Sequence, residues 1–108
     1  MASDFSRSSG EQKGGVATIP RTKTRRPTQF KVMLHNDDFT TMEFVIDVLM
    51  RYFEKDATEA TRIMLLVHYT GCGLAGIYPR EVAETKVSEV SEYAGANGFP
   101  LRCSMERE

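Results

Sequence analysis

The 108-residue sequence contains only two cysteines, Cys72 and Cys103, and they lie too far apart to indicate a disulfide framework. It has no apolar run near the roughly 18 residues that indicate a transmembrane helix, and no secretory hydrophobic region. These absences argue against a disulfide-stapled secreted domain and against a membrane-spanning protein. We therefore expect a cytoplasmic protein with reduced thiols and no membrane partner.

Motifs for common catalytic sites are also missing. The sequence has no Gly-x-Ser-x-Gly motif, no phosphate-cradling Gly-rich loop and no His-Glu-x-x-His motif. Possible metal ligands occur at His35, His68, Cys72 and Cys103, but without the tight Cys-x-x-Cys pairs of zinc sites. We expect no enzyme activity, no cofactor and no metal. A small metallo-hydrolase built on Asp38, His68 and Cys72 is kept as an alternative.

The overall composition, 41% hydrophobic and 27% charged, is ordinary for a soluble globular protein. The net charge of −1 is unevenly distributed, because residues 1–28 carry six basic and two acidic side chains while the remainder carries eight basic and thirteen acidic ones. Residues 1–28 are rich in Ser, Gly, Thr and Arg and have little apolar surface to bury, so we predict a disordered N-terminal extension. Residues 29–108 are predicted to form one core domain.

Hydrophobic periodicity predicts three strands and three helices in the core domain. The order is a strand over 29–35, a helix that follows Thr40 and runs to about Phe53, a helix over 57–69, a strand over 74–78, a helix with Pro79 in its first turn, and a final strand over 101–105. The predicted class is α+β, in the order βααβαβ, with three helices packed on one face of a small three-stranded antiparallel sheet.

Each predicted helix has an apolar stripe at the spacing i, i+3, i+4, i+7 or a close variant of it. Asp56 and Glu59 indicate the N-cap of the second helix, and Gly71 indicates its end. A bulge or close backbone approach is expected at Gly76. The stripe positions, which form the candidate core, are Val45, Val48, Leu49, Tyr52, Ala60, Ile63, Met64, Val67, Ala83, Val87, Val90 and Ala94.

A polar segment, Asn36-Asp37-Asp38, lies between the first strand and the first helix. Asn and Asp end strands and form turns. Thr40 and Glu43 have the spacing of a capping box, in which each side chain accepts a hydrogen bond from the other residue's backbone amide. We therefore expect a rigid corner rich in hydrogen-bond acceptors, suited to presenting them to a ligand. His68, near the end of the second helix, is commonly structural at such a position.

Four segments together resemble the ClpS family, the bacterial adaptors that deliver N-degron substrates to a Clp-type AAA+ protease. They are Asn-Asp-Asp-Phe-Thr-Thr-Met-Glu-Phe-Val at 36–45, Met64 with Val67-His68, Glu-Val-Ala-Glu-Thr-Lys at 81–86, and Pro100-Leu101. The resemblance covers about residues 28–107. The combination of the first and third segments is highly specific, whereas either alone is weaker.

The resemblance implies a protein that binds a free N-terminus beginning with Leu, Phe, Tyr or Trp. It implies that Asn36, Asp38 and His68 bind the α-amine. It further implies that the first side chain enters a hydrophobic pocket, with Met42 as a gate against β-branched residues. The residues that match this pocket are Thr40, Met42, Val45, Met64, Val67 and Leu101.

The resemblance also implies a partner. Glu81 and Lys86 match the surface that docks on the N-terminal domain of a ClpA-type AAA+ unfoldase, and the 1–28 extension matches the one that permits delivery. The expected protein is a monomer that binds no nucleic acid. A ribosome- or RNA-associated module is kept as a further alternative, because of the basic extension and the βααβαβ order.

The sequence departs from the family pattern at four positions. Phe39 stands where Tyr is usual, and Thr41 stands where Pro is usual at the helix start. His35 replaces a common aliphatic residue, and Ala75 replaces a frequent Cys. The loss of Pro is the change expected to loosen the gate around Met42.

Overall fold

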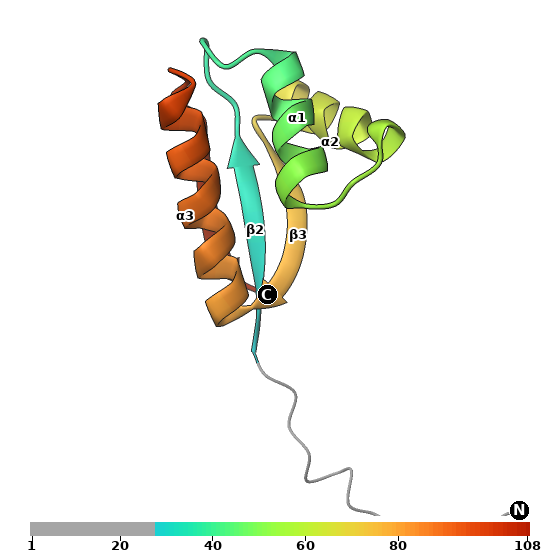
Figure 1. Cartoon of the computed structure of the whole chain (residues 1–108). Helices are drawn as coiled ribbons and strands as arrows, with labels where there is room; N and C mark the ends of the chain where they lie inside the picture. The colour runs from blue at the N-terminus through green and yellow to red at the C-terminus, as the bar shows by residue number, and fades with distance from the viewer. Residues whose placement is uncertain (1–27) are drawn as a thin grey trace, which may run out of the picture.

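The computed structural model describes residues 28–108, and the predicted N-terminal extension lies outside them except for Thr28. Strands and helices follow the predicted order (Figure 1). The elements are β2 (Gln29–His35), α1 (Met42–Tyr52), α2 (Ala57–Thr70), β3 (Cys72–Pro79), α3 (Arg80–Ala96) and β4 (Arg102–Arg107). The α+β prediction is therefore confirmed.

The three strands form one antiparallel sheet in the order β3-β2-β4, with β2 in the centre. His35, at the end of β2, pairs with Cys72 and Arg102, whereas Phe30, near its start, pairs with Tyr78 and Arg107. The register between β2 and β3 shifts after Val32, which leaves one extra residue of β3 beside Gly76. The predicted bulge is therefore present, with Ala75, the neighbour of Gly76, as the extra residue.

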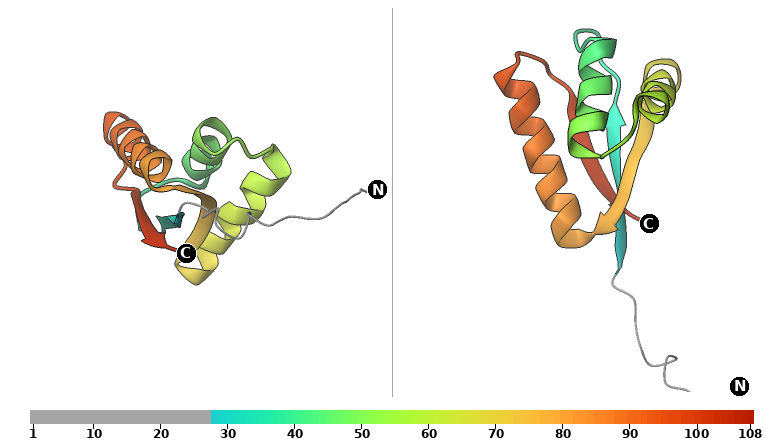
Figure 2. Two further views of the ribbon diagram at one scale, coloured as in Figure 1. Left: turned by 90° about the horizontal axis from the view of Figure 1, so that it is seen from below. Right: turned by 45° about the vertical axis from the view of Figure 1, so that its right-hand side comes forward.

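The hydrophobic core lies between the helices and the sheet face that carries Val32 and Leu34, both of which are fully buried. Figure 2 shows α1 and α3 over this face and α2 beside β3. Val67 of α2 lies so close to β3 that a Cβ atom on Gly73 would approach its Cγ2 to 2.8 Å. Most of the predicted stripe is buried, but Tyr52 and Val87 are only half-buried and Phe44 and Phe53 join the core.

A polar contact joins α1 to α3 at the edge of the core. The Tyr93 hydroxyl donates a hydrogen bond to Asp47 Oδ2, and Arg51 donates to the same carboxylate. These hydrogen bonds, that from Tyr93 first, outweigh partial burial and hold the pKa of Asp47 below its ordinary value. The contact fixes the two helices that lie over the sheet.

The start of α1 differs from the prediction. The N-cap is Thr41, whose hydroxyl accepts a hydrogen bond from the Phe44 backbone amide at 3.1 Å. The prediction of a capping box between Thr40 and Glu43 is therefore wrong. The physical reason is that both the amide and the hydroxyl of Thr40 already donate to Asp37. The cap of α2 is as predicted, with Asp56 accepting from the Glu59 amide and Gly71 ending the helix at φ 98°.

Candidate functional site

The segment that joins β2 to α1, together with the first residue of α1, is called the acceptor corner below; it comprises residues 36–42. Asp37 organises it, because Oδ1 accepts the amides of Phe39 at 2.8 Å and Thr40 at 2.7 Å, while Oδ2 accepts the Thr40 hydroxyl. Partial burial alone would raise the pKa of Asp37, but the hydrogen bonds from Thr40 and Phe39 outweigh it and lower the pKa. Asp37 is therefore an ionised structural residue that holds the turn.

Asn36 and Asp38 differ from Asp37 in being exposed. Within residues 28–108, neither side chain makes a hydrogen bond or an ion pair. A carboxylate and an amide oxygen that have no partner among the described residues can accept hydrogen bonds from a ligand. The turn that Asp37 fixes thus displays two acceptors.

His68 lies in the last turn of α2 and is exposed, with its ring edge-on to Tyr69 at a centroid distance of 4.9 Å. The backbone amide of Asn36 donates a hydrogen bond to the backbone carbonyl of Gly71 at 2.9 Å, which holds the start of the acceptor corner against the end of α2. The strand register also brings Leu101, next to Arg102, to this end of the sheet. Figure 1 shows the same convergence at the top of the molecule, where β2 ends and α1 begins.

The apolar residues assigned to the pocket fall into two groups. Val45, Met64, Val67 and Leu101 are at most 6% exposed and belong to one contiguous core cluster. Met42, in contrast, is 40% exposed at the first position of α1, and Thr40 is half-buried. The first four residues are therefore part of the hydrophobic core, whereas Met42 presents a flexible apolar side chain at the surface.

The proposed docking residues lie on α3. Glu81 is exposed, and it lines a shallow groove of about 400 Å³ together with Lys86. We call this the α3 groove; its lining residues are Glu81, Val82, Thr85, Lys86 and Glu89.

Lys86 is also tied to the rest of the fold, a role that the sequence did not indicate. Its Nζ donates to the Tyr52 carbonyl at 2.7 Å and lies 6.0 Å from the Phe53 ring and 5.7 Å from the Tyr78 ring. The ammonium group therefore binds the C-terminal end of α1, where backbone carbonyls lack helical partners. No local sequence signal connects residues 52 and 86.

The remaining candidate ligands do not form a metal centre. In residues 28–108, no three His, Cys, Asp or Glu side chains lie together closely enough to hold a metal ion. The structure therefore gives no support to a hydrolase site on Asp38, His68 and Cys72. Burial raises the pKa of Cys103 to about 12, so this thiol is an inert part of the core. Among the same residues, no helix combines the length and apolarity needed to cross a bilayer.

Comparison with known proteins places this architecture in a family. Residues 25–104 match the family described as "ATP-dependent Clp protease adaptor protein ClpS". The chain belongs to the ClpS family. It is thus an adaptor of the ATP-dependent Clp protease. The family is named for this adaptor role and not for a catalysed reaction.

Individual relatives agree with this placement. The ATP-dependent Clp protease adapter protein ClpS of Desulfatibacillum aliphaticivorans is 61% identical over 98 residues, which cover 91% of this chain and 94% of the relative. That of Lawsonia intracellularis is 50% identical over 96 residues, covering 89% and 88%. The structure of Agrobacterium tumefaciens ClpS2 bound to L-phenylalaninamide has a TM-score of 0.74 and 38% identity, covering 77% of this chain and 100% of that one.

Proposed function

We propose that this adaptor binds the free N-terminus of proteins that begin with Leu, Phe, Tyr or Trp and delivers them to the Clp AAA+ protease. The observation that carries the proposal is the ligand of the Agrobacterium tumefaciens structure. L-Phenylalaninamide has a free α-amine and a benzyl side chain, and an amide replaces its carboxylate. It therefore has the chemistry of a protein's first residue. The 38% identity to that protein supports the same ligand class here.

The α-amine would bind at the acceptor corner. An N-terminal amine has a pKa of about 7.7–8.0, so near neutral pH it is mostly charged and donates three hydrogen bonds. The exposed Asp38 carboxylate and Asn36 amide oxygen supply two acceptors, and the ring of His68, when neutral, supplies a third. The fixed turn around Asp37 keeps the first two acceptors in place before the ligand arrives.

The first side chain would enter beside Met42 and Thr40 and rest on an apolar floor formed by Val45, Met64, Val67 and Leu101. Burying about 150–250 Å² of an aromatic side chain is worth roughly 4–6 kcal/mol, and charge-assisted hydrogen bonds add roughly 1.5–3 kcal/mol each. Association costs at least about 4 kcal/mol, which brings the affinity near micromolar. Neither part is sufficient alone, so binding requires both a free amine and a large apolar residue.

A panel of fluorescent peptides that differ only in the first residue tests this proposal. We expect Leu, Phe, Tyr and Trp peptides to bind near micromolar, and Ala and Ser peptides at least about a hundredfold more weakly. The matched control is N-acetylation of the Phe peptide, which removes the charge while keeping the side chain. Equal binding of the acetylated peptide would contradict the amine site.

Delivery requires contact with the unfoldase. We assign it to Glu81 and Lys86, which would dock on the N-terminal domain of a ClpA-type unfoldase, with the extension of residues 1–28 engaging the same machine in the cytoplasm. Deletion of residues 1–20 should then leave peptide affinity unchanged but stop degradation of a Leu-initiated reporter by the reconstituted protease. Degradation at the full rate would remove the extension from the mechanism.

A further inference from the structure

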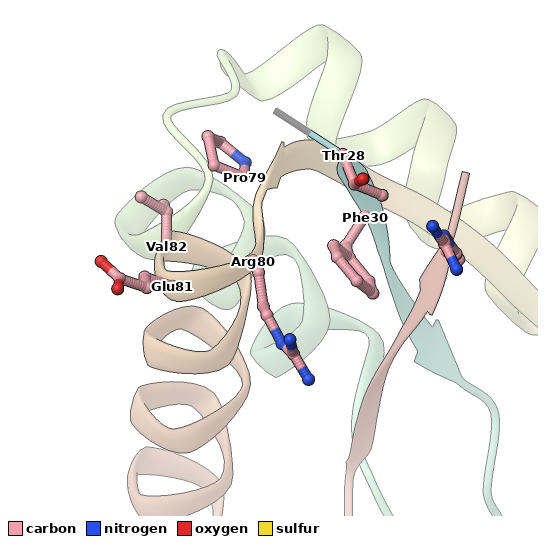
Figure 3. Close-up of a pocket in the computed structure, with 7 residues that line it drawn as sticks. Thr28, Phe30, Pro79, Arg80, Glu81 and Val82 are labelled. Carbon is pink, nitrogen blue, oxygen red and sulfur yellow. The ribbon is translucent and has the colours of Figure 1, made fainter. Parts of the chain in front are cut away.

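A hollow of about 720 Å³ lies at the end of the sheet opposite the acceptor corner (Figure 3). It is formed where β2 begins, β3 turns into α3 and β4 ends. We call it the arginine hollow; its lining residues are Thr28, Phe30, Pro79, Arg80, Glu81, Val82 and Arg107. None of the residues assigned to the amine site or its pocket takes part in it.

The half-buried ring of Phe30 shares the hollow with two arginines, Arg80 and Arg107. Arg107 is its direct partner in the β2–β4 ladder, so both side chains lie on the same face of the sheet. Arg80 approaches from the first position of α3, with its guanidinium carbon 6.0 Å from the ring centroid. The close-up in Figure 3 shows Arg80 and Phe30 on the same hollow, coming from different elements. The result is an aromatic surface flanked by positive charge.

The charges of the hollow favour an anionic ligand. Two arginines face one acid, Glu81, and the N-terminal end of α3 adds a partial positive charge. Arg80 also pairs with Glu84 at 3.6 Å, but both side chains are more than half exposed, so this ion pair exchanges easily with a ligand. Within residues 28–108, Arg107 forms no ion pair.

The chain's own N-terminal extension is a poor occupant of this hollow. The stretch 21–26, which leads toward Thr28, contains four basic side chains and no acidic one. Placing it on Arg80 and Arg107 would bring like charges together. The occupant is therefore better sought in a partner that carries carboxylates.

We propose that the arginine hollow binds an acidic segment of the Clp unfoldase, an Asp or Glu next to a large apolar side chain. The carboxylate would bind Arg107 and Arg80, and the apolar side chain would rest on Phe30 and on Val82, which is 41% exposed. The hollow shares Glu81 and Val82 with the α3 groove, so the two form one continuous surface. This inference rests on the docking role given to the α3 groove under the proposed function.

The test measures binding of the full-length adaptor to the purified Clp unfoldase hexamer, held with a non-hydrolysable ATP analogue. In the double variant Arg80→Gln/Arg107→Gln we expect affinity to fall at least about tenfold at roughly 0.1 M salt, and the difference to shrink at roughly 0.5 M. The matched control Arg62→Gln removes another exposed arginine, one paired with Glu59 on α2, and should leave affinity unchanged.

A second variant and a second readout keep the result interpretable. Arg107→Glu, made alone, should weaken unfoldase binding more than Arg107→Gln, even where the double variant folds poorly. Binding of a Leu-initiated peptide to the free adaptor should stay unchanged in all variants. If the wild type itself does not bind this peptide, the proposed amine site is wrong, and that result is separate from the test of the hollow. Unchanged unfoldase affinity would overturn the proposal. Variants that alter only self-association or RNA binding would overturn it equally, because the hollow would then serve another partner.

Discussion

The acceptor corner and the arginine hollow lie at opposite ends of the same sheet and have opposite chemistry. The first displays the Asp38 carboxylate and the Asn36 side-chain amide, and the second is lined by two arginines and Phe30. Their separation along β2 is roughly 20 Å, since Phe30 and Asn36 are six positions apart in extended chain. Under the two proposals, a cationic N-terminus and an anionic unfoldase segment would bind at opposite ends of the sheet and would not compete.

Helix α1 links the acceptor corner to the α3 groove, which adjoins the arginine hollow. Met42, its first residue, lies at the acceptor corner, and Tyr52, its last, accepts the hydrogen bond from Lys86 of the α3 groove. An 11-residue helix is about 16 Å long, so α1 spans most of the distance. A substitution at one end can reach the other through the position of this helix or along the strands of the sheet. Measuring both kinds of binding in each variant therefore tests whether the two regions are independent.

The largest expected effect comes from removing the charge of the acceptor corner. Asp38→Ala should weaken binding of Leu- and Phe-initiated peptides more than about a hundredfold, because it leaves an ammonium unpaired in a partly dry site. Unfoldase binding and circular dichroism should not change. The matched control is Glu43→Ala, which removes a nearby exposed carboxylate and should cost little. Wild-type affinity in Asp38→Ala would sink the amine-site assignment.

The next effect is on specificity. Met42→Ala should admit Ile and Val peptides with about tenfold higher affinity and little loss for Leu, because the side chain proposed to reject β-branched residues is removed. Met50→Ala is a matched control, since Met50 is 44% exposed further along α1. A fluorescence-anisotropy series over peptides that begin with Ile, Val or Leu measures both variants. Unimproved Ile binding in Met42→Ala would make Met42 part of the floor and not a gate.

The fold was predictable from the sequence because its signals are local. Alternation in β2, apolar stripes on the helices, and the cap at Asp56 each depend on residues within one or two turns of each other. The prediction of the α1 N-cap was wrong because the local pattern fits two residues. Thr40 and Thr41 both suit an N-cap, and only the turn around Asp37 decides between them. The Asp-x-x-Thr spacing carried that signal.

The sites were less predictable from residue patterns alone. Only the family resemblance grouped Asn36, Asp38 and His68 into one set. The contact that brings their segments together is a hydrogen bond from the Asn36 backbone amide to the Gly71 carbonyl, and no residue pattern predicts it. The arginine hollow combines residues from β2, α3 and β4, and Lys86 reaches a carbonyl 34 positions away. Such contacts depend on tertiary packing, and hydrophobic periodicity in the sequence does not predict which distant residues meet.

A smaller effect separates docking from support within the α3 groove. Lys86→Met should lower the free energy of unfolding by about 1–2 kcal/mol, because the Tyr52 carbonyl loses a charged donor. Glu81→Gln should leave that free energy unchanged, since Glu81 is exposed. Urea denaturation compares the two variants, and unfoldase binding is measured beside it. A Lys86→Met variant as stable as the wild type would leave docking as the only role of Lys86.

The smallest expected effect concerns Asp37 and the rigidity of the acceptor corner. Its pKa is lowered in the folded protein, so its stabilisation is fully present above the ordinary Asp pKa of about 3.9 and is lost as pH falls through the folded pKa. At pH 7, Asp37→Asn should cost only about 1 kcal/mol, since the corner is largely solvated and Asn keeps one acceptor oxygen. This difference from the wild type, measured by urea denaturation, should vanish as pH falls from about 5 to about 2. Asp38→Asn, which removes no hydrogen bond in the described structure, should leave stability at pH 7 unchanged. A difference for Asp37→Asn that stays constant across this range would mean that the ionised carboxylate does not hold the turn.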